Sequence, residues 1–279
     1  MRNILKLLAV IMIMAGAATM AYAQEIHRYK LGDFELIAIM QQANAMNPAN
    51  VLNENPSKLA SLTNIKGWDG SSMSYFVLKA NGKTILFDTG LQPTNTKQML
   101  AKAGVMTDDV DMIVLTHTHG DHIGGMVDGT SAVFKKAHVY IATEEAAWWE
   151  KQGSASAILK AYSNMTRFAQ NANIAPGIVS VPAFGHTPGH TAYKITSGGK
   201  TLVIWGDIVH TAIQFMDPDT YLKYDSDPKT AIATRKALMA DIAGSQAYVA
   251  GMHMVSPLVG KIKEAETGYE FVPQPDGAM

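Results

Sequence analysis

Residues 117–122 hold most of the chemistry that this sequence offers. They read His-Thr-His-Gly-Asp-His, so His117, His119, Asp121 and His122 lie within six positions, although the whole chain of 279 residues has only 9 histidines. The segment follows the apolar run 112–115, which predicts a buried strand. Imidazole and carboxylate groups gathered at the end of a strand can bind a divalent metal. Their spacing leaves room for two ions.

Three further residues of the same chemistry follow other apolar runs. His186, Asp207 and His253 each come just after a predicted strand. Active-site groups gather at strand ends in α/β folds. Together with the first four residues, they make seven candidate ligands, five imidazoles and two carboxylates. Such a set can hold two metal ions and still leave positions for water and substrate.

Alternating patterns along the chain predict the elements that position these residues. Predicted strands lie at 34–40, 74–79, 84–87, 112–115, 138–142, 178–181, 193–196, 202–205 and 247–250. Predicted helices lie at 94–103, 144–152, 155–170 and 228–243, the last with Asp227 as N-cap and Pro228 at its first position. Strands in both halves with helices between them predict a layered α/β domain, in which sheet is buried between helices.

Residues 41–68 interrupt this alternation. They are rich in Asn and Pro and show no clear period, which predicts a long surface loop. Two interpretations stay open, a functional lid or contact surface and a tolerated insertion.

Residues 1–23 have the pattern of a secretory signal peptide. A basic start and a short apolar core are followed by the small-residue sequence Ala-Tyr-Ala, which ends at Ala23. The apolar core is shorter than the roughly 20 residues that a membrane-spanning helix needs. We therefore expect cleavage near Ala23, a single domain over 24–279, a periplasmic or secreted location and no membrane partner.

Composition excludes several functional classes. Without Arg2 and Lys6 the chain has 21 basic residues against 24 acidic ones and no dense basic run, so no nucleic-acid partner is expected. The chain has no cysteine, which removes thiolate both as a nucleophile and as a metal ligand. Stability must then come from the core, from oligomerisation or from bound metal.

The ordered motifs resemble those of the metallo-β-lactamase superfamily over essentially all of 24–279. They are Phe-Asp-Thr-Gly at 87–90, the segment 117–122, Gly-His-Thr-Pro-Gly-His at 185–190, Gly-Asp at 206–207 and Gly-Met-His at 251–253. The resemblance implies a four-layer αββα sandwich.

The resemblance also implies how the ligands divide between two metal ions. One ion would be held by His117, His119 and His186 and the other by Asp121, His122 and His253, with Asp207 bridging both. Asp88 would support the ligand loops by orienting a metal-bound histidine. Zinc is the expected metal, and manganese, iron and cobalt are compatible with the same ligands.

We expect other roles for the remaining histidines. His27 and His138 are expected to be solvated or structural, and His190 is expected to serve structure rather than bind metal. His210 follows Asp207 by three residues, where some lactone-hydrolysing relatives carry a tyrosine that polarises the substrate. A catalytic role and simple packing stay open for His210.

The expected reaction is hydrolysis. Two metal ions about 3.5–4 Å apart can share a bridging water and lower its pKa towards neutrality, so that the hydroxide attacks a carbonyl or phosphoryl centre. Asp121 is expected both to bind metal and to carry a proton to the leaving group. No Gly-x-Ser-x-Gly motif offers a competing nucleophile.

Within the superfamily, the chain resembles the exported methyl parathion hydrolase and lactonase group. The matching segments are 31–35, 184–191, 214–215, 225–227 and 268–273. Members hydrolyse lactones, aryl esters and sometimes phosphotriesters, and they tend to be homodimers. Residues 91–96 lack the aromatic that lines the leaving-group pocket of the organophosphate enzyme, which favours a small-molecule lactone or carboxylic ester as substrate. The predicted pocket residues are Trp149, Ile158 and Leu159.

Three alternatives stay open. A phosphotriester hydrolase would use the same metal centre. A β-lactamase of the commonest class has a cysteine where Asp207 stands, which argues against that class. A non-catalytic periplasmic zinc-binding protein would bind metal without turnover.

Overall fold

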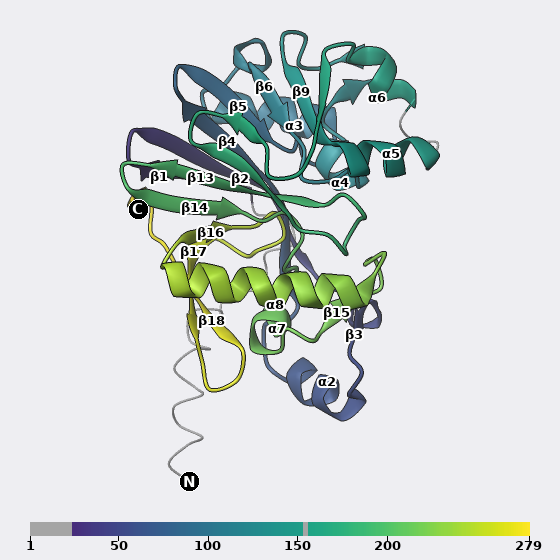
Figure 1. The fold of residues 1–279 in the computed structure, drawn as a ribbon, viewed down its shortest axis with the longest axis vertical. Coiled ribbons are helices and arrows are strands. Elements are labelled where there is room, and N and C mark those ends of the chain that lie inside the picture. Colours follow the sequence, from purple (N-terminus) through teal and green to yellow (C-terminus); the bar gives the residue numbers. More distant parts are fainter. Residues whose placement is uncertain (1–23, 153–155) are drawn as a thin grey trace.

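Two β-sheets face each other in the computed structural model, and helices cover their outer surfaces (Figure 1). The structure describes residues 24–152 and 156–279. The predicted signal peptide lies outside the described residues, so its removal stays a prediction. Over the described ranges, no helix is both long and apolar enough to cross a membrane.

The first sheet has eight strands and carries the segment 117–122. Its spatial order is β10 (Met165–Phe168), β9 (His138–Ala142), β6 (Met112–Val114), β5 (Lys83–Phe87), β4 (Gly70–Ala80), β2 (Phe34–Ala45), β1 (Glu25–Leu31) and β19 (Gly277–Ala278). Strands β5, β6, β9 and β10 run parallel to one another. The carboxyl ends of β5 and β6 therefore lie at one edge, where Asp88 and His117 follow them.

The second sheet has seven strands and carries the other three predicted ligands. Its order is β11 (Asn173–Ala175), β12 (Ile178–Pro182), β13 (Thr191–Ser197), β14 (Lys200–Ile204), β16 (Tyr248–Ala250), β17 (Val259–Glu264) and β18 (Tyr269–Pro273). Strands β14 and β16 are parallel, so Asp207 and His253, which follow them, also share an edge.

The helices and short elements complete the layers. The helices are α2 (Pro56–Thr63), α3 (Pro93–Lys102), α4 (Gly120–Ile123), α5 (Thr143–Lys151), α6 (Ser156–Ala161), α7 (Ile213–Met216) and α8 (Pro228–Ser245). Two short strand pairs are β3 (Val51–Leu52) with β15 (Tyr221–Leu222), and β7 (Val127–Asp128) with β8 (Ser131–Ala132). Single 3₁₀ turns cover Pro48–Asn50 and Thr107–Asp109.

Apolar side chains pack these layers together. Successive side chains along a strand point to opposite faces of the sheet, so one strand can pack against a layer on each side. In β2, Leu36 and Met40 face the second sheet in the central core, while Ile37 and Ile39 face the opposite way. The outer residues of the first sheet pack against α3 and α5, and those of the second sheet pack against α8. The layers are therefore helix, sheet, sheet and helix, as the predicted αββα sandwich requires.

Two predictions about local structure are wrong. The predicted helix 155–170 ends at Ala161, and Met165–Phe168 instead forms β10, because Met165 pairs with Val139 at the edge of the first sheet. The predicted loop 41–68 contains regular structure. Strand β2 continues to Ala45 along β4, and α2 follows the N-cap Asn55.

Candidate metal centre

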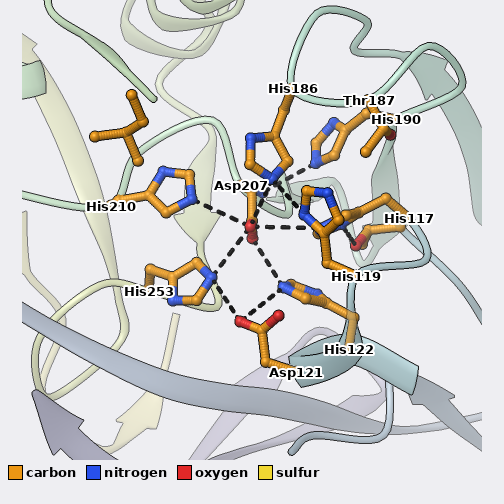
Figure 2. A network of polar contacts seen from close by, with 12 residues as sticks. His117, His119, Asp121, His122, His186, Thr187, His190, Asp207, His210 and His253 are labelled. Carbon is orange, nitrogen blue, oxygen red and sulfur yellow. Dashed lines mark hydrogen bonds and ion pairs between the residues drawn. The ribbon is translucent and has the colours of Figure 1, made fainter. Parts of the chain in front are cut away.

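The seven predicted ligands converge where the edges of the two sheets meet (Figure 2). Strand β6 and helix α4 bring in four of them, and the loops after β12, β14 and β16 bring in one each. Residues distant in sequence thereby come together, namely His117, His119, Asp121, His122, His186, Asp207 and His253. All of these side chains except those of His119 and Asp121 are fully buried.

The donor atoms form groups with the spacing that a metal ion requires. One group contains His117, His119, His186 and Asp207, and its donor atoms all lie within 4.8 Å of one another. The His186 Nε2 and His119 Nδ1 atoms are 3.0 Å apart, and the His117 Nε2 and Asp207 Oδ2 atoms are 3.5 Å apart. Ligand atoms at about 2.0–2.1 Å from a tetrahedral zinc ion are separated by roughly 3.3 Å. The spacing therefore fits one ion.

A second group contains Asp121, His122 and His253. The Asp121 Oδ2 atom is 3.6 Å from His122 Nε2 and 3.4 Å from His253 Nε2. These separations have the same magnitude as those in the first group, so a second ion fits here.

Several donor atoms have no other partner among the described residues. His117 Nε2, His122 Nε2 and Asp207 Oδ1 are buried and make no hydrogen bond. The His122 and Asp207 atoms lie 3.2 Å apart, yet they do not align as donor and acceptor. Buried polar atoms without partners are costly and rare. A divalent cation in each of the two groups would satisfy all three atoms, so these residues fit the predicted metals.

Asp207 is the residue that contacts both groups (Figure 2). Its Oδ2 atom lies 3.1 Å from His186 Nε2 and 3.1 Å from His253 Nε2, and its Oδ1 atom faces His122. Burial opposes ionisation of Asp207, but the charges of His122 and His253 outweigh it and hold the pKa of this carboxyl well below its usual value. The carboxylate is thus placed as a bridge.

His190 holds the backbone of Asp207 through a hydrogen bond and does not lie in a position to bind metal. Its Nδ1–H donates to the Ala183 carbonyl at 2.9 Å, and its Nε2 accepts from the Asp207 amide at 3.0 Å. Both nitrogens are therefore occupied. The preceding Gly206 has a φ of +60°, and a Cβ there would lie 2.4 Å from His190 Nε2, so only glycine fits between them.

Each group has its own orienting hydrogen bonds. Asp88 accepts from His122 Nδ1 at 2.7 Å and from the Thr116 amide and hydroxyl. Asp225 accepts from His186 Nδ1 at 2.8 Å. A bond at Nδ1 fixes the ring and directs Nε2 at the metal. The sequence predicts this role for Asp88, whereas Asp225 stands out there only as part of a matching segment.

The His253 ring is fixed in a different way. Its Nδ1 donates to the Ser72 carbonyl at 2.7 Å, so a backbone group of β4 in the first sheet orients a ligand of the second sheet. No sequence signal identifies Ser72, because a carbonyl is present at every residue.

His210 lies in the site, beside Asp207 and His253. Its Nε2 is 3.1 Å from Asp207 Oδ2, and its ring stacks on that of His253 at 4.6 Å between centroids. Burial lowers the pKa of His210 to about 4, so the ring is neutral at pH 7. His210 Nδ1 is buried without a partner among the described residues. The residue can thus serve as an eighth ligand or contact a substrate.

The structure places Trp149, one of the predicted pocket residues, in the core. Trp149 is 1% exposed and packs in the core between the first sheet and α5. Trp148 instead lies edge-on to the His119 ring, with 5.9 Å between centroids. Adjacent helical positions point in different directions, and the sequence does not show which one faces the site. Ile158 also packs in that outer core, and the side chain of Leu159 lies outside the described residues.

Glu145 is a buried residue that no sequence motif identifies. Its carboxylate accepts hydrogen bonds from Thr118, between two ligands, and from Thr187 and Gly189 in the loop of His186. Burial raises its pKa even though these hydrogen bonds act in the opposite direction. One carboxylate therefore ties together two ligand loops.

Curated proteins match part of this chain. A probable metallo-hydrolase of Mycobacterium bovis is 28% identical over 137 residues, which cover 42% of this chain and 43% of that protein. The match thus spans less than half the length of the curated relative.

Solved structures match over a larger share of the chain. The hydrolase AbOPH of the beta-lactamase superfamily has a TM-score of 0.82 and 27% identity, with 90% of this chain and 98% of that chain covered. AidC, a dizinc quorum-quenching lactonase in complex with a product, has a TM-score of 0.78 and 26% identity, with 91% and 98% covered.

These likenesses confirm the predicted fold and support a metal-dependent hydrolase. The metallo-beta-lactamase superfamily matches residues 67–241, which is more than half of the sequence, and the chain therefore belongs to that superfamily.

Proposed function

We propose that this chain is a dinuclear, zinc-dependent hydrolase that opens lactones or cleaves related carboxylic esters. The observation that carries the proposal is the divided ligand set, in which two groups of donor atoms meet at Asp207. The likeness to a dizinc lactonase at 26% identity over nearly all of that chain supports the same reaction. Export and a homodimeric state remain predictions from the sequence.

The protein groups have distinct tasks in this proposal. When bound, two divalent ions would lower the pKa of water and polarise the oxygen of the substrate carbonyl. Asp121 Oδ2 faces His122 and His253, which leaves Oδ1 to accept a proton and pass it to the leaving oxygen. The Asp121 side chain is 22% exposed, so it is accessible to substrate. Burial opposes ionisation of Asp121, but His122 and His253 lower its pKa and keep it ionised.

One aromatic side chain beside the metal ligands supports a small ester or lactone with an apolar chain. Trp148 is half-buried and lies edge-on to the His119 ring, with 5.9 Å between ring centroids. Its indole offers contact area to an acyl chain.

The test is to purify the protein from the full-length gene, measure its metal content and assay four substrates. The substrates are an N-hexanoyl-homoserine lactone, an aryl carboxylic ester, a phosphotriester and nitrocefin. We expect about two zinc ions per chain, by the ligand count, and the highest kcat/KM for the lactone. The N-terminal residue of the exported protein, expected to be Gln24, tests signal-peptide removal in the same preparation.

Other outcomes would redirect the proposal. A preference for the phosphotriester or for nitrocefin would overturn the substrate class and leave the metal centre intact. Two bound zinc ions without turnover of any of the four would favour a zinc-binding protein that is not an enzyme.

A further inference from the structure

Glu145 contacts both sides of the ligand set through one carboxylate. Its Oε1 accepts from the Thr118 amide and hydroxyl, each at 2.8 Å. Its Oε2 accepts from the Thr187 hydroxyl at 2.6 Å and from the Gly189 amide at 3.1 Å. Four hydrogen bonds to an ionised acceptor are stronger than the same bonds to a neutral one. Glu145 is therefore fixed to two loops at once.

The two loops supply the three histidines of one metal group. Thr118 lies between His117 and His119, and Thr187 directly follows His186. The loops come from different sheets, after β6 and after β12. Glu145 is bonded to the loops of this group, and none of its four hydrogen bonds reaches His253 of the other.

The backbone around Glu145 is built for this close approach. A Cβ added to Gly189 would lie 2.0 Å from the Glu145 amide nitrogen, so the ligand loop rests directly on α5. Glu145 is only 1% exposed, and burying a carboxylate is costly unless hydrogen bonds compensate. A residue chosen for packing alone would not need a charge at this position.

We propose that Glu145 is a positioning residue that holds the loops of His117, His119 and His186 at the separation required by one metal ion. It does not touch the substrate or the metal, so it acts through Thr118, Thr187 and Gly189. The inference rests on the proposed two-metal function and adds a residue that determines the affinity of one of the two sites.

The test compares Glu145→Gln with the matched control Glu144→Gln in the full protein. Glu144 is exposed on the same helix. Glutamine keeps the size but can accept only at its carbonyl oxygen, so one loop loses its bonds. Zinc affinity is measured by competition with a chromophoric chelator, and the visible spectrum is recorded after loading with cobalt(II). We expect Glu145→Gln to lower the affinity for one of the two zinc ions by about tenfold or more. The absorption of cobalt(II) at that position should also change, while Glu144→Gln should match the wild type in both measurements.

Wild-type affinity and an unchanged cobalt spectrum in Glu145→Gln would overturn the inference. If Glu145→Gln does not fold, Thr187→Val provides the second test, because it removes one donor and keeps the shape of the side chain. Thr187→Val should lower the affinity for the same zinc ion by a smaller factor. Unchanged affinity for both ions would contradict the role of Glu145. A wild-type protein that binds fewer than two ions would refute the proposed function instead.

Discussion

The two halves of the metal centre are built in different ways. The first sheet supplies four donors from one short segment, 117–122, which begins after β6 and ends in α4. The second sheet supplies His186, Asp207 and His253 from three separate loops, the last two of which lie 46 residues apart. The first half is set by local backbone structure, whereas the second half depends on the packing of strands and on contacts between loops.

Long-range hydrogen bonds compensate for this difference. Asp225 orients His186, the Ser72 carbonyl orients His253, and His190 holds the backbone of Asp207. In the first half, Asp88 accepts from both Thr116 and His122, and Glu145 accepts from Thr118. The second half, whose ligands come from three separate loops, therefore has a separate supporting hydrogen bond for each ligand. Asp207 is the ligand that contacts both metal groups.

Substitution of Asp207 should have the largest effect, because it removes the residue that contacts both metal groups. In Asp207→Ala, we expect lactone turnover to fall by more than the roughly 10–100-fold that is typical of changes behind the ligands. The zinc content should fall below that of the wild type. Asp219→Ala, at an exposed carboxylate that pairs with Lys236, serves as control. Retention of both ions and of turnover in Asp207→Ala would exclude a bridging role.

The two adjacent tryptophans of α5 should separate stability from substrate binding. Trp149→Ala should lower the free energy of unfolding by about 3–5 kcal/mol, because it opens a cavity in the core. Trp148→Ala should mainly raise KM for a long-chain lactone, since its ring borders His119. Denaturant unfolding and steady-state kinetics measure the two effects. A selective KM effect from Trp149→Ala would return that residue to the substrate pocket.

Removal of the orienting carboxylates should affect different ions. Asp88→Asn should lower the affinity for the zinc ion near His122 by about 10–100-fold. Asp225→Asn should lower the affinity for the zinc ion near His186 by a similar factor. Zinc competition and cobalt spectra of both variants test this division. Weaker binding of the same ion in both variants would show that the two metal groups are not oriented separately.

The smallest expected effect is a pH dependence of the metal-free protein. Burial alone would lower the pKa of His186, but bonds to Asp207 and Asp225 raise it to about 9. A histidine pKa raised above its ordinary value of 6.5 adds stability that is present below about pH 6.5 and is lost as the pH rises through 9. The Tm of the metal-free protein should therefore fall across this range.

Two measurements locate that pH dependence in the second half. Asp225→Asn should reduce the fall in Tm, because it removes one of the groups that raise the pKa of His186. Zinc-loaded protein should not show the fall, since metal binding requires neutral imidazole. An unchanged fall in Asp225→Asn would place its origin elsewhere.

The first half of the site, segment 117–122, can be identified from the sequence without knowledge of the fold. Residues 117–122 are contiguous, so their shared chemistry is visible in the order of the amino acids alone. His186, Asp207 and His253 can be proposed because each follows an apolar run, and the structure brings them to the same place. The predicted N-cap of α8 is also confirmed, since Asp227 accepts from the Thr230 amide.

The features that the sequence does not reveal depend on tertiary contacts. Glu145 looks like any acidic residue in the first turn of a helix until the loop of His186 is placed against it. The rotation of α5 about its axis decides whether Trp148 or Trp149 faces the metal site. Two adjacent aromatic residues in a helix do not show from the sequence which of them faces the site. Strand β10 forms because Met165–Phe168 finds a partner in β9, a pairing that local pattern does not reveal.

The central claim is that both ligand groups must be filled for hydrolysis. The most direct test is to strip the purified protein with a chelator and titrate zinc back while the opening of N-hexanoyl-homoserine lactone is followed. Turnover is predicted to be absent without metal and to rise until about two equivalents are bound, by the ligand count. Full turnover at one equivalent, or turnover by the metal-free protein, would contradict a centre that works through two groups joined at Asp207.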